Sequence, residues 1–436
     1  MAEATAHGRG ALAVIRLSGP LAHDIGLRVI ARWPAEPRTA VLSHLRDDAG
    51  NTLDQAVAVR YDAPASFTGE DAVELSTHGG STVPATIVAA LIAAGARLAT
   101  PGEFTRRAVL NGKLDLLQAE AVGDLVSATS RAAQRLALSQ LDGGLSRRLL
   151  DLRARILGLE ALIAYDIDFP EEDDGPIPRE KIATSLAEVI NGLDALLVTA
   201  KTGELVREGA LVVLAGVPNA GKSSLFNALL GRRRAIVTDL PGTTRDAIEA
   251  VIDTDRMPLR LVDTAGLRET TEEVERIGVD VSYEYLSRAA IVLACGATGE
   301  EIQAAVVACS GKSSAPIVPV QTKSDLGASA VPDAVAVSSA TGAGLDTLLG
   351  RITRMLGDSA IEPDAPILTR ARHRERVAQA RRELVQFRDA WSGSDVPAIV
   401  AAVHLRAASA SLEELIGRID VESILDEVFS RFCVGK

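Results

Sequence analysis

The sequence predicts a multidomain α/β protein with an N-terminal α+β domain, an all-α helical domain, and an inserted, doubly wound and mostly parallel α/β domain. Three changes of pattern support this fold class. Residues 1–111 mix strand-like runs with Gly and Pro turns, and residues 112–208 carry Leu and Ala at helical spacing. Strands alternate with helices over 209–358, and residues 359–436 are helical again. A length of 436 residues accommodates two to four domains.

The elements follow in order along the chain. One Ala-rich helix near 87–96 accompanies three predicted N-terminal strands, at Ala11–Leu17, Gln55–Arg60 and Ala72–Ser76. Helical periodicity begins near Leu116 and continues through Leu145–Leu162, until an acidic stretch at 166–174. The inserted domain has five short apolar runs that we expect to be strands, at Leu211–Ala215, Leu259–Val262, Ala290–Ala294, Pro316–Val320 and Val335–Val337. A linker with Pro363 and Pro366 precedes the last helical part, which we expect to pack on the first.

Composition limits the possible partners. The net charge of −12 disfavours non-specific binding to phosphate backbones, so a nucleic-acid substrate needs a local basic patch or a partner protein. Three cysteines form no paired spacing, and the first ten residues have no apolar core, which together predict a cytoplasmic protein without a signal peptide. The apolar run near Ile87–Ala96 is too short to span a bilayer.

Residues 216–223 read Gly-Val-Pro-Asn-Ala-Gly-Lys-Ser, a complete phosphate-binding loop between a predicted strand and a predicted helix. The glycines let backbone N–H groups face the phosphates of a nucleotide. Lys222 is expected to reach the β- and γ-phosphates, and Ser223 to hold Mg²⁺.

Further motifs of a guanine-nucleotide switch follow in the right order. Thr244, within Gly-Thr-Thr-Arg-Asp at 242–246, is the expected second Mg²⁺ ligand, and Asp263 would bind the metal through water. The N–H of Gly266 would sense the γ-phosphate. Asp325 is expected to accept two hydrogen bonds from the edge of guanine, with support from Ser339 and Ala340.

The predicted guanine-nucleotide site comprises Asn219, Ala220, Gly221, Lys222, Ser223, Ser224, Thr238, Asp239, Leu240, Pro241, Gly242, Thr243, Thr244, Asp263, Thr264, Ala265, Gly266, Thr322, Lys323, Ser324, Asp325, Ser339, Ala340 and Thr341. Two positions depart from the usual pattern. Thr322 stands where an Asn is usual, which predicts weaker affinity for the base. Leu267 stands where many small GTPases carry the Gln that orients the attacking water.

Another group must therefore do the work of that Gln. Asn219 could help to hold a monovalent cation against the phosphates, in place of an arginine finger. A carboxylate could orient the water, and the residues alone do not choose among Glu269, Glu272, Glu273 and Glu275.

Motifs across nearly the whole chain resemble those of the MnmE (TrmE) family, the GTPases of tRNA uridine modification. They are Gly8–Gly10, Ile15–Gly19, Phe67–Asp71, Val73–Leu75, His78–Gly80, Pro101–Arg107, Asn111–Leu116, Gln118–Ala121, Phe169–Asp173 and the terminal Phe432–Lys436. The resemblance implies an N-terminal domain that forms a homodimer and binds 5-formyl-tetrahydrofolate or a related tetrahydrofolate. By position, its ligands would be Arg16, Glu74, Lys113 and Lys436.

The same resemblance implies a K⁺-dependent GTPase. Potassium would be held by Asn219, Thr238, Leu240 and Thr243, and magnesium by Ser223 and Thr244. Glu275 falls at the family's water-orienting glutamate, which makes Glu275, Lys222 and Asn219 the expected catalytic residues. The family works with MnmG, an FAD- and NADH-dependent partner, on C5 of the wobble uridine of tRNA. Cys433 is a candidate functional thiol.

Compared with this family, residues 1–7 stand in place of a longer apolar strand, so we expect either a frayed first strand or a misassigned start of the chain. Cys295 follows a strand where an Asp is common. Seven arginines on one predicted helix form the best basic patch, which could meet tRNA or instead pair with the acidic 166–174 stretch: Arg370, Arg372, Arg374, Arg376, Arg381, Arg382 and Arg388. Two rival functions are a ribosome-assembly GTPase and a folate-binding dimer scaffold whose nucleotide domain does not catalyse.

Overall fold

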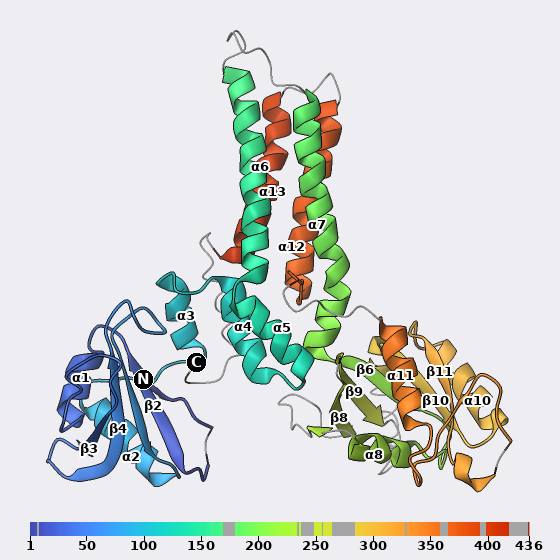
Figure 1. Cartoon of the computed structure of the whole chain (residues 1–436), viewed down its shortest axis with the longest axis horizontal. Coiled ribbons are helices and arrows are strands. Elements are labelled where there is room, and N and C mark those ends of the chain that lie inside the picture. The colour runs from blue at the N-terminus through green and yellow to red at the C-terminus, as the bar shows by residue number, and fades with distance from the viewer. Residues whose placement is uncertain are drawn as a thin grey trace, which may run out of the picture. The chain divides into compact units, whose positions relative to one another are not determined.

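The computed structural model in Figure 1 describes residues 1–6, 8–168, 179–232, 235–236, 248–254, 256–263, 284–327, 329–357, 365–392, 398–417 and 435. The chain divides into two compact units. The first comprises residues 1–123, 141–153 and 409–436, and the second comprises residues 124–140 and 154–408. The predicted division into four sequence segments stays a prediction.

The first unit contains a five-stranded antiparallel sheet of order β1-β2-β5-β4-β3. Its strands are β1 (Ala2–Glu3), β2 (Leu12–Ser18), β3 (Val41–Arg46), β4 (Thr52–Tyr61) and β5 (Ala72–His78). Side chains alternate between two faces, so Ile15 and Leu75 are buried while Arg16 and Glu74 lie on the opposite face. Helices α1 (Ala22–Val29) and α2 (Thr82–Ala93) supply further core residues, Ile25, Ile87 and Leu91.

The start of the chain is ordered rather than frayed. Met1 is buried, and its amino group donates a hydrogen bond to the Arg97 carbonyl oxygen at 2.8 Å. The short strand β1 pairs with β2, with Ala2 opposite Arg16. The expectation of a frayed first strand is wrong, because burial and hydrogen bonding hold the segment.

Helices complete the first unit. They are α3 (Glu103–Leu110), α4 (Leu116–Ser127), and the adjoining ends of α6 (Gly144–Asp168) and α13 (Ala398–Ile416). Leu116 and Leu117 are buried, and Gly417 packs on Leu116. Arg153 of α6 forms an ion pair with Glu413 of α13 at 2.8 Å, so sequence positions 260 residues apart lie together.

In the second unit, α6 and α13 continue beside α7 (Arg179–Glu208) and α12 (Ala371–Ser392) (Figure 1). Ion pairs connect successive helices around this bundle: Arg155–Glu188, Asp194–Arg381, Glu383–His404 and Arg406–Glu160. The expected packing of the two helical segments is therefore observed. Helix α7 alone among the described helices is long and apolar enough to cross a membrane by length and composition, and 39% of its most apolar window is buried in the protein.

A seven-stranded sheet of order β12-β11-β10-β6-β9-β8-β7 forms the α/β part of the second unit. Its strands are β6 (Ala210–Ala215), β7 (Ala235–Ile236), β8 (Ile248–Asp253), β9 (Pro258–Asp263), β10 (Ile291–Gly296), β11 (Ile317–Gln321) and β12 (Val335–Ala336). Five strands are parallel, and β7 and β8 are antiparallel additions. Around the sheet lie helices α8 (Lys222–Arg232), α10 (Gly299–Ser310) and α11 (Leu345–Leu356). The predicted fold class is confirmed.

The helix α5 (Arg131–Leu141) joins the core of this sheet. Ala132 and Leu136 are buried in the same apolar cluster as β6 and β9 residues. The Arg131 N–H at the start of α5 donates to the Asp253 carboxylate at the end of β8, at 3.3 Å. This packing connects a helical segment that precedes the inserted domain to the two strands that flank the switch sequences.

Candidate functional site

The phosphate-binding loop connects β6 to α8, as the sequence predicts for its strand and helix. Every residue of β6 is buried, so the strand fixes the position of the loop. Asn219 has a φ of +62° and Gly221 a φ of +82°, which turn the backbone before the first helical residue, Lys222. A Cβ on Gly216 would stand 2.3 Å from the Cys295 carbonyl oxygen, so the loop approaches β10 as closely as backbone allows.

Lys222 lies inside this loop and is nearly fully buried. Its ammonium group donates to the carbonyl oxygens of Gly216 and Val217, both at 2.9 Å. A buried ammonium group needs such acceptors, because its desolvation is otherwise costly. The side chain is therefore already curled over the loop, where the phosphates of a nucleotide would provide stronger, charged acceptors.

Ser223 and Asp263 are brought together from two elements. The Ser223 hydroxyl at the start of α8 donates to the Asp263 carboxylate at the end of β9, at 2.6 Å. Asp263 is buried, with 2% of its surface exposed. One hydroxyl oxygen and one carboxylate at this distance form the hard oxygen donor set that suits Mg²⁺.

The base-recognition motifs also meet the loop. The Thr322 hydroxyl, which is buried, donates to the Ala220 carbonyl oxygen at 2.6 Å. The Lys323 ammonium group donates to the Asn219 carbonyl oxygen at 3.0 Å, and Lys323 has a φ of +55°. The loop after β11 is thus tied to the phosphate-binding loop by two hydrogen bonds from consecutive residues.

Asp325 lies in the short 3₁₀ helix Ser324–Leu326 and is exposed. The Ser324 N–H donates to the Val337 carbonyl oxygen at 3.1 Å, which sets the turn at 338–341 beside this helix. Ser339, Ala340 and Thr341 are in that turn, and the Thr341 N–H donates to the Ser338 hydroxyl at 3.1 Å. The predicted base-recognition residues therefore lie together on one side of the phosphate-binding loop.

The remaining predicted nucleotide, metal and thiol residues lie outside the described residues. They are Thr238, Asp239, Leu240, Pro241, Gly242, Thr243, Thr244, Thr264, Ala265, Gly266, Glu275, Cys433 and Lys436, together with the alternatives Glu269, Glu272 and Glu273. Ser224 is described and is exposed on the first turn of α8. Cys295 is buried, and burial raises the pKa of its thiol to about 12, so it stays protonated beside the loop.

A second candidate site lies on the face of the N-terminal sheet opposite its core. A cavity of about 150 Å³ is lined by Arg16, Ser18, Tyr61, Ser66, Phe67, Thr68, Ala72, Glu74 and Phe104. Arg16 and Glu74 are directly opposite each other on β2 and β5, and the Arg16 Nε donates to Glu74 at 2.8 Å. The Tyr61 hydroxyl donates to the other carboxylate oxygen of Glu74 at 3.3 Å. A charged pair with aromatic walls can recognise a flat, polar ligand.

Sequence reasoning missed the aromatic members of this cavity. The Arg16 guanidinium lies 5.8 Å from the ring centroids of both Phe67 and Phe104, in cation–π geometry. Both phenylalanines are within motifs that we quoted for the family resemblance, and that was the available signal.

The other predicted folate residues lie near this cavity. Lys113 donates to the Pro64 carbonyl oxygen at 3.1 Å and packs on Gly69, so it contacts the loop that forms one cavity wall. Lys436 lies outside the described residues, but its neighbour Gly435 is placed against Glu3 and Ala4. That segment adjoins β1, whose Ala2 pairs with Arg16. Arg16 and Glu74 are thus in contact, and Lys113 is on the cavity wall.

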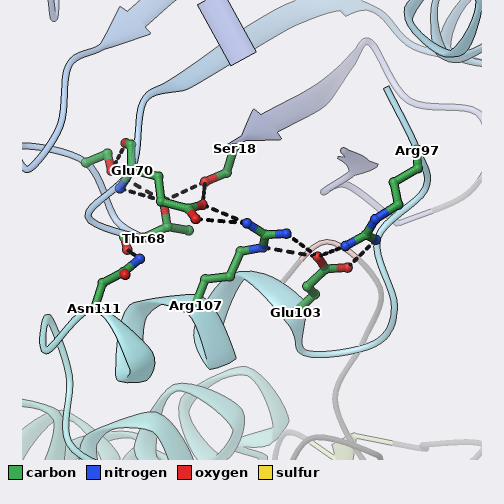
Figure 2. Close-up of polar contacts among 8 residues, drawn as sticks. Ser18, Thr68, Glu70, Arg97, Glu103, Arg107 and Asn111 are labelled. Atoms are coloured by element: carbon green, nitrogen blue, oxygen red, sulfur yellow. Dashed lines mark hydrogen bonds and ion pairs between the residues drawn. The ribbon is translucent and has the colours of Figure 1, made fainter. Parts of the chain in front are cut away.

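A network of alternating carboxylates and guanidiniums holds that wall (Figure 2). Arg107 of α3 donates to both oxygens of Glu70, at 2.9 and 3.0 Å, and also to Glu103. The Ser18 hydroxyl donates to Glu70 at 2.8 Å. Arg97 donates to both oxygens of Glu103, at 2.9 and 2.6 Å.

This network joins two motifs that are separated in the sequence, Phe67–Asp71 and Pro101–Arg107. Hydrogen bonds from Arg97 and Arg107 hold the pKa of Glu103 at about 2, well below the ordinary value of 4.5. Glu103 therefore stays ionised across the physiological range and binds Arg107, which in turn binds Glu70 in the loop that carries Phe67.

Three of the seven arginines on and just before α12 are paired with carboxylates of other helices. Arg370, Arg374 and Arg381 form ion pairs with Asp124, Glu204 and Asp194, respectively. These partners belong to α4 and α7, not to the 166–174 stretch that the sequence suggested, most of which lies outside the described residues. Pairing within the protein lowers the charge that α12 can offer to a nucleic acid.

The doubly wound sheet carries a phosphate-binding loop with a buried lysine, a serine–aspartate pair and a base-recognition loop. Together these features define a P-loop GTPase. Comparisons with known proteins specify the family. The model of the "GTP-binding protein TrmE N-terminus" matches residues 1–113, and that of the "MnmE helical domain" matches residues 116–433. The chain belongs to the MnmE (TrmE) family.

Curated relatives match over the full length. The tRNA modification GTPase MnmE of Aquifex aeolicus (strain VF5) is 42% identical over 445 residues, covering 100% of this chain and 99% of the relative. The protein of the same name from Azoarcus sp. (strain BH72) is 41% identical, covering 100% and 97%. Among solved structures, the G domain of the T. maritima FeoB iron transporter is 25% identical, with a TM-score of 0.27, covering 34% of this chain and 98% of that one.

Proposed function

We propose that this chain is the potassium-activated GTP hydrolase of a tRNA-modifying pair. With an MnmG-type partner that uses FAD and NADH, it would convert C5 of the wobble uridine, position 34, to an aminomethyl or carboxymethylaminomethyl form. The observation that carries the GTPase part is the joint placement of Lys222, Ser223 and Asp263 at one loop. The tRNA part is supported by full-length relatives named tRNA modification GTPases.

Lys222 and the loop N–H groups would bind the phosphates of GTP. The lysine gives up two neutral carbonyl acceptors, Gly216 and Val217, and gains charged phosphate oxygens. Mg²⁺, when bound, neutralises charge on the β- and γ-phosphates. Ser223 would hold it, with Thr244 as the second protein ligand and Asp263 oriented toward its water.

Potassium would replace the missing glutamine and arginine. Asn219 is held in the left-handed conformation at the outer edge of the loop, and Lys323 fixes its carbonyl oxygen. Its side chain is exposed. It would contribute an oxygen to a K⁺ ion, together with Thr238, Leu240 and Thr243. Glu275 would orient the attacking water, since Leu267 cannot.

The N-terminal cavity would bind 5-formyl-tetrahydrofolate or a related one-carbon donor. A volume of about 150 Å³ is below the usual range for a whole ligand site, ~300–1,000 Å³, so the cavity suits a pterin ring with the remainder outside. Glu74 would accept from the donor edge of the pterin, and Lys113 and Lys436 would bind carboxylates of the tail.

The remaining proposals concern assembly. The chain would act as a homodimer in the cytoplasm and join MnmG-type subunits. Because the α12 arginines that form ion pairs do so within the protein, contact with tRNA would depend strongly on the partner. Cys433 stays a candidate thiol for the modification chemistry.

The first experiment measures GTP turnover by the purified full chain in KCl and in NaCl at equal ionic strength. We expect turnover to be at least about tenfold faster in KCl, because one well-placed charge at the transition state contributes on the order of this factor or more. Lys222→Ala is the matched control and should be inactive in both salts. Equal and negligible rates for the unmodified chain would favour the folate-binding scaffold instead.

A second experiment separates tRNA modification from ribosome assembly. Mass spectrometry of wobble uridines from a deletion strain should show loss of the C5 modification, restored by the intact gene and not by the Lys222→Ala variant. Unaltered wobble uridines in the deletion strain would reject the tRNA function.

A further inference from the structure

Three side chains with metal-binding groups meet at one end of the N-terminal sheet, in the first unit. They are His23 of α1, Asp62 directly after β4, and Asp71 directly before β5. One ligand atom from each lies within 4.8 Å of one from each of the others. We propose that these residues bind a borderline divalent cation of the Zn²⁺, Co²⁺ or Ni²⁺ class.

The state of the imidazole is the first argument. The His23 Nε2 lies 3.1 Å from the Tyr61 carbonyl oxygen. A carbonyl oxygen can only accept, so Nε2 carries a hydrogen, which leaves Nδ1 as the ring nitrogen available to a metal ion. This is how metal-binding histidines are commonly held, with the second ring nitrogen donating to a carbonyl group.

The surroundings of Nδ1 are the second argument. It lies 3.8 Å from the Asp71 Oδ2, so a single metal ion placed between the two atoms would contact both. The other oxygen of Asp71 accepts from the Ala63 N–H at 2.8 Å, which orients Oδ2 toward the histidine.

Asp62 supplies the third argument. Its Oδ1 is buried and has no hydrogen-bond partner among the described residues, although it lies 3.8 Å from His23 Nε2. Arg60 lies 3.7 Å from the other oxygen. Two carboxylates facing one neutral imidazole and one arginine leave negative charge unbalanced, which a divalent cation would offset.

The distances suit a cation of this class after a small closure. Two ligands of one zinc ion, each about 2.0–2.2 Å from it, can be no more than about 4.4 Å apart. The three ligand atoms lie within 4.8 Å of one another, a few tenths of an ångström more than this separation. Asp62 is half-exposed, so its side chain is able to rotate toward the others. One imidazole with two carboxylates favours zinc-like ions over Mg²⁺ or Ca²⁺, which prefer oxygen ligands alone.

The location gives the ion a consequence. Asp62 and Asp71 bound the loop that carries Ser66, Phe67 and Thr68, one wall of the cavity with Arg16 and Glu74. A cation bound by both ends of this loop and by α1 would hold the two ends of the loop together. The cavity wall would then be fixed by Arg107 on one side and by the ion on the other, whichever ligand the cavity binds.

The test uses the full chain, freed of metal by chelation and then saturated with Mg²⁺ and GDP to occupy the nucleotide site. Zn²⁺ is added, and bound zinc per chain is counted after gel filtration. We expect His23→Ala and Asp71→Asn each to lower the count by one ion. His78→Ala is the matched control, since His78 also pairs with an aspartate, Asp54 at 2.7 Å, and should leave the count unchanged.

Co²⁺ and thermal unfolding supply independent readouts. Cobalt should give a visible absorption band that is absent in His23→Ala, and Zn²⁺ should raise the unfolding midpoint of the unmodified chain but not of that variant. An equal zinc count in His23→Ala and the unmodified chain would overturn the proposal. So would an unfolding midpoint that responds to pH through His23 but not to zinc, because a proton alone would then occupy the site.

Discussion

At the scale of single residues, Thr322 shows how an unusual residue can keep a structural role. The sequence suggested that Thr in place of Asn weakens base recognition, because it has fewer polar groups. Its hydroxyl nevertheless donates to the Ala220 carbonyl oxygen from a fully buried position. The contact between the base-recognition loop and the phosphate-binding loop therefore survives, and only direct contact with the base is affected.

Thr322→Val should separate these two roles, because valine keeps the shape and removes the hydroxyl. The Ala220 carbonyl oxygen would lose its buried donor, which costs on the order of 1–3 kcal/mol and predicts GDP binding weaker by about tenfold or more. Titration of a fluorescent GDP analogue measures this. Ser310→Ala on α10 is the control, and a Thr322→Val variant that binds as tightly as that control would exclude the tether.

At the scale of elements, the loop 62–71 and helix α3 act together. Glu70 and Arg107 are 37 residues apart in the sequence and form a bidentate ion pair. The network extends from Arg107 through Glu103 to Arg97 (Figure 2). Bidentate pairs of this kind fix orientation as well as distance. The network should therefore hold the cavity wall more rigidly than loop packing alone.

Glu103 makes this network sensitive to acid. Its pKa is about 2 in the folded protein and 4.5 ordinarily. A depressed folded pKa contributes stability that is fully present above about pH 4.5 and is lost as pH falls toward about 2. Glu103→Gln should therefore lower the thermal midpoint at pH 7 and flatten its decline between about pH 5 and 3.

Thermal unfolding followed by circular dichroism across this pH range measures the effect. Glu36→Gln, at an exposed position, is the control and should follow the unmodified chain. If Glu103→Gln declines with acid as steeply as that control, the ion pairs contribute little to stability.

How far the sequence predicts these elements depends on burial. The buried runs at β6, β10 and β11 were readable, because a strand covered on both faces is continuously apolar. The strands β3, β7 and β8 were missed. Strand β3 exposes Leu42 and carries polar residues at an edge of its sheet, and so has a weak pattern.

The candidate sites were predictable only in part for a related reason. Motif order identified Lys222, Ser223 and Asp263, but the contacts of Thr322 with Ala220 and of Tyr61 with Glu74 join residues from different elements. No local spacing encodes such contacts, since they depend on how the strands are ordered in the sheet.

At the scale of the whole molecule, α5 joins the second unit's core next to the strands that flank the switch sequences. Strand β8 follows the 242–246 motif and β9 ends at Asp263, so the end of the first switch sequence and the start of the second are attached to one hairpin. Leu136 is buried in the apolar cluster that includes this hairpin. Movements of the switch region should thus reach α5 through packed side chains.

Leu136→Ala tests how strongly α5 is held. Removal of a buried leucine side chain costs about 2–5 kcal/mol, depending on how far the site collapses. We expect a lower denaturant midpoint and a weaker stimulation of GTP turnover by potassium, because α5 would no longer support β8 and β9. Leu138→Ala on the exposed side of α5 is the control. A variant with normal stability would show that α5 is not anchored there.

Gly435 has a consequence for engineering the chain. With a φ of +99°, it lies so close to Glu3 and Ala4 that a Cβ would stand 2.7 Å from the Glu3 carbonyl oxygen. Because Gly435 lies against Glu3, a short peptide could connect it to the first strand, and the chain could be reopened at the turn Asp47–Gly50. Such a circular permutant would keep every strand pairing of the five-stranded sheet while leaving no free end beside Arg16.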